Sequence, residues 1–122
     1  MKSAWPEHPD YKINISLYPK RVRVIVQGET VADSQQVLLV EEQEHAPVYY
    51  FPPADVRTEL LHKAEKSTFC PFKGEADHWT LQLESARFEA VLWSYASPFD
   101  EVKEITDHFA FYPEVAGNMV EE

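Results

Sequence analysis

The sequence predicts a mainly β (α+β) fold, in which two antiparallel sheets form a tent or a sandwich-like barrel with two short helices inserted. Several short segments carry strand patterns, and turns rather than crossover helices join them. A chain of 122 residues without a recognisable linker fits one domain, 1–122, and is long enough to bury a core without disulfides.

The first half of the chain contains most of the short strand patterns. Ile13 and Ile15 indicate a short strand or an extended arm. A hairpin is expected over residues 21–32, because its valines share one face at period two and Gly28 supplies a turn. Two further strands are expected over Val37–Val40 and Val48–Phe51.

Pro53–Lys66 has the strongest helical pattern in the chain. Val56, Leu60, Leu61 and Ala64 form one apolar stripe at helical spacing. Proline in the first turn is compatible with a helix start. We therefore expect a helix here, followed by a constrained loop over residues 67–76.

The second half predicts another hairpin, a capped helix and a last strand. Trp79–Leu83 alternates, and Phe88–Tyr95 returns after a turn. Ser97, followed by proline and an acid, looks like a helix start. Phe109–Tyr112 is the last predicted strand, and Gly117–Glu122 is expected to be a frayed tail.

Composition excludes some functions and favours others. The formal charge of −10 repels phosphate backbones, so no nucleic-acid polymer is expected as a partner. The single cysteine fits a reducing compartment. The N-terminus lacks the apolar region of a signal peptide, and no apolar run approaches a membrane span. We expect a cytoplasmic, soluble protein with no membrane partner, and the oligomeric state stays open.

Several segments carry residues of a kind that lines ligand sites. Lys73 lies on a constrained loop, where it is as well suited to meet an anionic ligand as to be solvated. Trp93 and Tyr95 share a strand face, which is the candidate pocket wall. Polar-tipped residues elsewhere complete the predicted ligand-binding set: Arg23, Tyr50, Asp55 and Tyr112.

Three residues are assigned to shaping the loop: Cys70, Pro71 and Gly74. Cys70 could be a nucleophile activated by Lys73 or His78, but a packing role is favoured because no base lies at a diagnostic spacing. The five histidines show no metal-ligand spacing, and three glycines cannot build a phosphate-binding loop. No metal and no cofactor is therefore expected.

One set of motifs extends over most of the chain and resembles a known family. The most specific motif is Cys70-Pro71-Phe72-Lys73-Gly74, followed by Trp93-Ser94-Tyr95 and Phe109-Ala110-Phe111-Tyr112. With Arg21–Val24, Tyr50–Pro52 and Asp55-Val56, these residues resemble the family of unknown function numbered four hundred and twenty-seven, over about residues 5–115. That family also carries a nucleotidyltransferase-like label.

The resemblance implies a fold more than a reaction. The family is similar to the β-tent group, which includes methionine sulfoxide reductase B and the thalidomide-binding domain of cereblon. Members with zinc hold it with two Cys-x-x-Cys pairs, and one cysteine cannot supply that site.

Three hypotheses for function follow. The first is a small-ligand-binding domain with an aromatic-lined pocket and Lys73 at its mouth. The second is an enzyme acting on a nucleotide or related metabolite in the same pocket, and the third is a protein-interaction module. A carboxylate pair in the cleft would favour the enzyme.

Overall fold

The computed structural model describes residues 2–117 and 119–122. Within them the strands form three antiparallel sheets rather than the two that the sequence predicted. The fold is mainly β, as expected, and no helix among these residues is long and apolar enough to cross a membrane.

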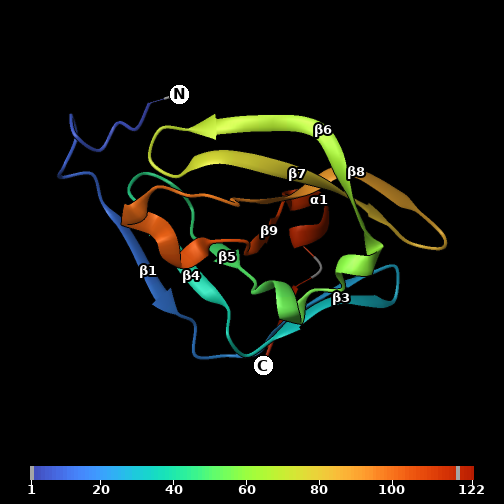
Figure 1. The fold of residues 1–122 in the computed structure, drawn as a ribbon. Helices are drawn as coiled ribbons and strands as arrows, with labels where there is room; N and C mark the ends of the chain where they lie inside the picture. Colours follow the sequence, from blue (N-terminus) through green and yellow to red (C-terminus); the bar gives the residue numbers. More distant parts are fainter. Residues whose placement is uncertain (1, 118) are drawn as a thin grey trace.

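The first sheet has the strand order β1-β4-β5, with β1 Ile13–Leu17, β4 Leu38–Glu42 and β5 Val48–Tyr50. The second has the order β10-β2-β3, with β10 Met119–Glu121, β2 Val22–Val26 and β3 Glu29–Ser34. The third has the order β6-β7-β8-β9, with β6 Leu61–Cys70, β7 Gly74–Gln82, β8 Arg87–Ser94 and β9 Phe109–Phe111. In Figure 1 β6, β7 and β8 run across the top of the molecule, and β1, β4 and β3 lie below them.

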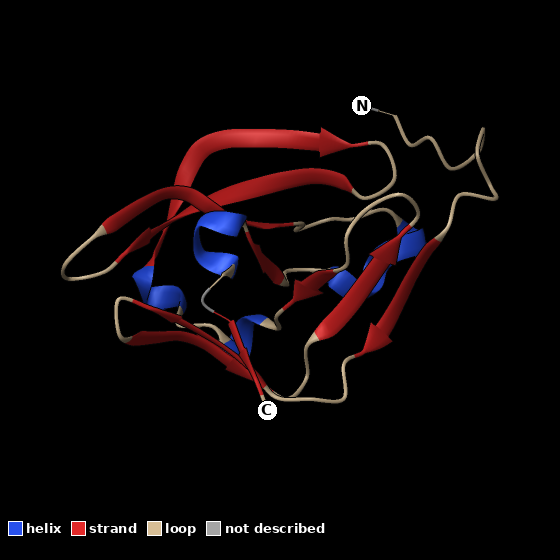
Figure 2. Ribbon diagram, turned by 180° about the vertical axis from the view of Figure 1, so that it is seen from behind, coloured by secondary structure: helices blue, strands red, loops and turns tan. Residues whose placement is uncertain are grey.

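The helices are short. Three are 3-10 turns, η1 Pro53–Asp55, η2 Thr58–Leu60 and η3 Asp100–Ile105, and α1 Pro113–Ala116 is a single turn. Figure 2 shows these turns as small pieces between the strands. The helix predicted from Ser97 is thus the 3-10 turn η3, with Phe99 as its N-cap.

The prediction of a long helix over Pro53–Lys66 is wrong. Two 3-10 turns occupy its first half, and the second half belongs to β6. Leu61 pairs with Leu81 of β7, and Cys70 pairs with Gly74, so the expected loop over residues 67–76 is instead the tight end of a hairpin. The predicted apolar stripe contributes single residues to the core instead of a helix face.

The C-terminal tail is also more ordered than predicted. Met119–Glu121 pairs with β2, and the backbone of Glu122 exchanges hydrogen bonds with Arg21. The Arg23 guanidinium donates to the Glu122 carboxylate. Asn118, within the predicted frayed segment, lies outside the described residues.

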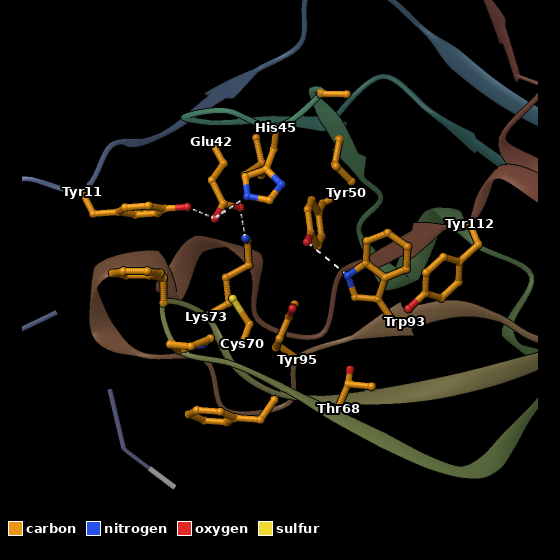
Figure 3. A pocket seen from close by; sticks show the side chains of 16 residues that line it. Tyr11, Glu42, His45, Tyr50, Thr68, Cys70, Lys73, Trp93, Tyr95 and Tyr112 are labelled. Atoms are coloured by element: carbon orange, nitrogen blue, oxygen red, sulfur yellow. Dashed lines mark hydrogen bonds and ion pairs between the residues drawn. The ribbon is translucent and has the colours of Figure 1, made fainter. Parts of the chain in front are cut away.

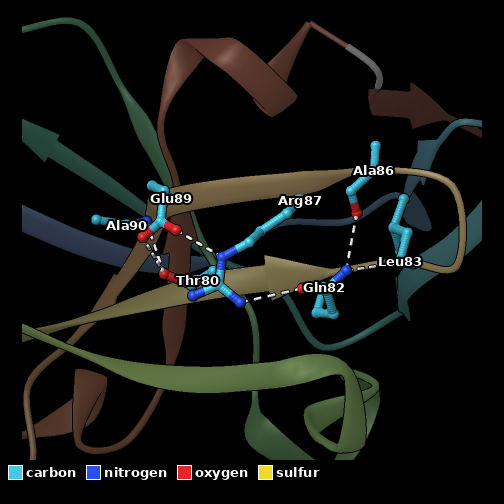
Figure 4. Close-up of polar contacts among 7 residues, drawn as sticks. All are labelled: Thr80, Gln82, Leu83, Ala86, Arg87, Glu89 and Ala90. Carbon is cyan, nitrogen blue, oxygen red and sulfur yellow. Dashed lines mark hydrogen bonds and ion pairs between the residues drawn. The ribbon is translucent and has the colours of Figure 1, made fainter.

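A polar network fixes an irregularity in the β7–β8 pair. The register shifts between Trp79 and Leu81, where Ala90 has a positive φ of 51°. Thr80 Oγ1 accepts the Ala90 N–H at 3.1 Å and donates to the Glu89 carboxylate at 3.3 Å (Figure 4). The Thr80 side chain therefore accepts from the Ala90 N–H, a backbone group that the bulge leaves without a partner in the strand pairing.

Two apolar clusters fill the interior. The larger one joins the second and third sheets through residues such as Val24, Phe51 and Leu92. The smaller one lies between the first and third sheets and includes Val40 and Tyr95. Phe51, which directly follows β5, exchanges two backbone hydrogen bonds with Phe109 of β9, so the first and third sheets meet there.

Candidate functional site

A cavity of about 570 Å³ lies where the first and third sheets meet. This volume is within the range of small-molecule sites, about 300–1,000 Å³. Aromatic rings form about half of its wall, with a few polar groups among the other side chains (Figure 3). The lining residues are Tyr11, Val40, Glu42, His45, Ala46, Val48, Tyr50, Thr68, Phe69, Cys70, Pro71, Phe72, Lys73, Trp93, Tyr95 and Tyr112.

The structure brings five of the seven predicted ligand-binding residues to this cavity. They are Lys73, Trp93, Tyr95, Tyr112 and Tyr50. They come from separate segments, namely β5, the β6–β7 turn, the end of β8 and the residue after β9. Their convergence depends on the contact between the first and third sheets, which the sequence pattern does not specify.

Asp55 and Arg23 lie elsewhere, so the expectation that they share this site is corrected. Asp55 ends η1 and accepts a hydrogen bond of 2.6 Å from Ser34 Oγ. Arg23 is on β2, where it pairs with Glu122. Both residues contact the second sheet, and neither lines the cavity.

The turn that carries Lys73 is anchored at both sides. The backbone N–H of Lys73 donates to the Cys70 carbonyl at 3.2 Å, and the Lys73 carbonyl accepts the Phe99 N–H at 3.0 Å. Gly74 has a φ of +118°, which a residue with a side chain adopts only with strain. Cys70 and Pro71 also line the cavity, so two of the three loop-shaping residues are part of its wall.

Lys73 is not a free cation at a pocket mouth. It is 7% exposed and donates to Oε1 of Glu42, which ends β4. The Tyr11 hydroxyl donates to the other carboxylate oxygen, and His45 Nε2 lies 3.8 Å from it. Burial opposes ionisation of Glu42, but the hydrogen bonds from Lys73 and Tyr11 outweigh it and lower the pKa of the carboxyl. Glu42 is therefore a carboxylate, and Lys73 is its ion-pair partner.

The aromatic wall is held in a fixed arrangement. Tyr50 meets Trp93 edge to face, with centroids 6.2 Å apart and planes at 90°. Trp93 Nε1 donates to the Tyr50 hydroxyl at 3.2 Å. Tyr112 lies tilted against Trp93, at a centroid distance of 4.4 Å. Such contacts favour one orientation of each ring, so the wall is preformed.

Two phenol groups face the interior of the cavity. Tyr50 is 1% exposed and Tyr95 is 6% exposed, and Figure 3 shows their hydroxyls turned toward one another. Burial raises the pKa of both, and for Tyr95 the nearby Tyr50 adds to the effect. Both groups are therefore neutral hydrogen-bond donors.

His78, which was one of the two possible bases for a Cys70 nucleophile, pairs with Thr68 instead. The imidazole is fully buried, its Nε2 lies 2.9 Å from Thr68 Oγ1, and its ring stacks on Tyr112. Cys70 is a free, half-buried thiol with no base as a hydrogen-bond partner among the described residues. No group of three or more metal-ligating side chains occurs in residues 2–117 and 119–122.

The N-terminal arm closes one side of the cavity. Tyr11 stacks on Phe72, with centroids 3.7 Å apart and planes at 5°. Trp5 packs edge-on against Phe72, and its Nε1 donates to the Phe72 carbonyl at 2.8 Å. The arm therefore grips the same turn that carries Lys73.

Sequence reasoning missed Glu42, Tyr11 and Thr68. Glu42 lies beyond the end of the strand predicted over Val37–Val40, although Val40 and Glu42 have the same parity on β4 and so share a face. That parity is the signal that could have found it. No comparable signal identifies Tyr11 or Thr68, because Tyr11 lies on an irregular arm and Thr68 lies on an exposed edge strand.

Comparison with known proteins finds one short match and one long one. A segment of 38 residues is 47% identical to glycylpeptide N-tetradecanoyltransferase of Emericella nidulans, and it covers 31% of this chain and 8% of that protein. The chain thus matches a small part of that protein's length.

The long match is to a family whose description is a domain of unknown function. It extends over residues 14–122 and so includes every cavity-lining segment except the one that carries Tyr11. The chain therefore belongs to the DUF427 family.

Proposed function

We propose that this domain binds a small organic molecule in the cavity between the first and third sheets. The observation that carries the proposal is the cavity itself, about 570 Å³ of space lined by rings and a few convergent polar groups. A preformed concave site of this composition is typical of small-molecule binding. The role of Lys73 differs from the original hypothesis, since it ties the turn to β4 through Glu42.

An enzyme with a carboxylate pair is not favoured. Among the described residues Glu42 is the one carboxylate that lines the cavity, and Lys73 and Tyr11 already occupy it. The short match to an acyltransferase does not change this, because it covers 8% of that protein. An interaction module is also less favoured, because Tyr50, Trp93 and Tyr95 line a cavity instead of an exposed surface.

The proposal extends to the setting of the protein. A single cysteine, and a charge of −10, fit a cytoplasmic domain that acts on small molecules and not on nucleic-acid polymers.

A protein-observed NMR screen of a library of small metabolites tests the function. Compounds that bind should shift the amide signals of Tyr50, Cys70, Trp93 and Tyr95. Ala46 is exposed at the edge of the cavity, so Ala46→Trp should obstruct entry and weaken binding at least about tenfold, or 1.4 kcal/mol.

Ala54→Trp is the matched control, because Ala54 is also exposed but lies in η1 and does not line this cavity. It should leave binding unchanged. Binding that survives Ala46→Trp, or shifts confined to another face, would contradict the proposal.

A further inference from the structure

The chemistry of the cavity restricts the kind of ligand, provided that the proposed function is right. The cavity presents two charged side chains, Glu42 and Lys73, and each already has the other as its partner. The remaining carboxylate oxygen accepts from Tyr11. An ionic ligand would have to break this pair or enter without a counter-ion, and either step carries a desolvation cost.

What the cavity leaves unused is hydrogen-bond donors. The Tyr50 oxygen accepts from Trp93 Nε1, so its own proton is available. The Tyr95 hydroxyl has no hydrogen-bond partner in the described part of the chain, although the residue is 6% exposed and its oxygen faces the cavity. A ligand that supplies an acceptor can therefore pair with this hydroxyl, and such a hydrogen bond contributes to binding.

The shape of the wall adds a second restriction. Trp93 and Tyr112 lie 4.4 Å apart at 48°, and Tyr50 stands perpendicular to Trp93. These rings offer faces and edges to a flat ligand, which can pack against them without losing much conformational freedom.

We propose that the cavity takes an uncharged, planar molecule that presents a carbonyl-type oxygen to the hydroxyls of Tyr50 and Tyr95. The walls bind the ring system, and the two phenols bind the oxygen. The high pKa values of both phenols keep them protonated, so they donate throughout the neutral range.

Three one-ring probes test the ligand class: benzamide is neutral with an acceptor, benzoate is anionic, and toluene has no acceptor. Dissociation constants are measured by NMR titration of the full chain. Benzamide should bind tightest. Tyr50→Phe and Tyr95→Phe should each weaken benzamide about 3- to 10-fold, the effect of one hydrogen bond, and should weaken toluene less than benzamide.

Tyr18→Phe is the matched control, because Tyr18 donates to Glu121 at the second sheet and does not line the cavity. It should change neither affinity. Thermal unfolding of each variant establishes that loss of binding is not loss of folding.

Two results would overturn this inference and leave the proposed function intact. One is benzoate binding tighter than benzamide, and the other is benzamide binding no tighter than toluene. If none of the three probes binds while library compounds still shift the cavity signals, the ligand class is wrong. If no compound shifts them, the proposed function falls as well.

Discussion

Lys73 and Glu42 are the two charges on which the geometry of the cavity depends. The side chains are 8% and 13% exposed, so each is desolvated and relies on the other. Removing one partner of such a pair leaves a buried charge, which is more costly than removing both.

Lys73→Met should therefore lower the free energy of unfolding by about 3 kcal/mol. Combining it with Glu42→Gln should recover a large part of that loss, because the unpaired carboxylate is gone and Tyr11 keeps an acceptor. Urea unfolding of the wild type, both single variants and the double variant measures the coupling. A double variant no more stable than Lys73→Met would contradict the account.

Acid should destabilise the fold through the same carboxylate. The pKa of Glu42 is lowered from 4.5 in the folded protein, so the unfolded chain binds its proton first as the pH falls. Its contribution is complete above pH 4.5 and is lost as the pH falls through the folded pKa. Glu42→Gln should flatten the stability profile in that range, measured by urea unfolding at several pH values.

His78 should make stability depend on pH in a higher range. Burial lowers its pKa from 6.5, and Lys66 adds to the effect. The unfolded chain therefore takes up this proton first, so stability is complete above pH 6.5 and declines as the pH falls below it. His78→Gln should reduce that decline, whereas His62→Gln, at an exposed position of β6, should leave it unchanged.

Replacing Gly74 should lower the stability of the fold. Its φ of +118° is strained for any residue with a side chain, so Gly74→Ala should cost about 1–2 kcal/mol. Gly117→Ala is the control, because Gly117 has a φ of −66° and open space around it. Comparable losses of thermal stability in the two variants would contradict this explanation of the turn.

Among the larger elements, the N-terminal arm is the one that completes the cavity from outside the sheets. Trp5 anchors it through the Phe72 carbonyl and the ring contact. Trp5→Ala should release the arm and increase tryptic cleavage after Lys12 several-fold. Lys2→Ala removes an exposed ion pair of 4.0 Å and should have no such effect. Unchanged cleavage in Trp5→Ala would show that the arm is held by other contacts.

The elements also show where sequence patterns succeed and fail. The predicted strands over Val48–Phe51 and Phe88–Tyr95 correspond closely to β5 and β8, because β-branched and aromatic residues favour strands in both segments. The first part of β6 lies within the predicted helix, and β6 is an edge strand with a register shift between Lys63 and Ser67. Its middle is exposed and polar on both faces, so no period of two remains to identify it.

For the molecule as a whole, the mainly β class could be predicted and the number of sheets could not. The class follows from short periodic segments, whereas the sheets depend on pairings between distant segments, such as β10 with β2. The same limit applies to the site. The rings of Trp93 and Tyr95 could be assigned to one wall from a single strand, but the partners Glu42 and Tyr11 come from the opposite sheet and the arm.

The proposed function assigns a small molecule to the space between the first and third sheets. A crystal structure of the protein with its strongest binder tests it most directly. We predict that the compound occupies the cavity, with its ring against Trp93 and an acceptor atom within hydrogen-bond distance of the Tyr95 hydroxyl. A compound bound to another face, with the cavity unchanged, would contradict the account.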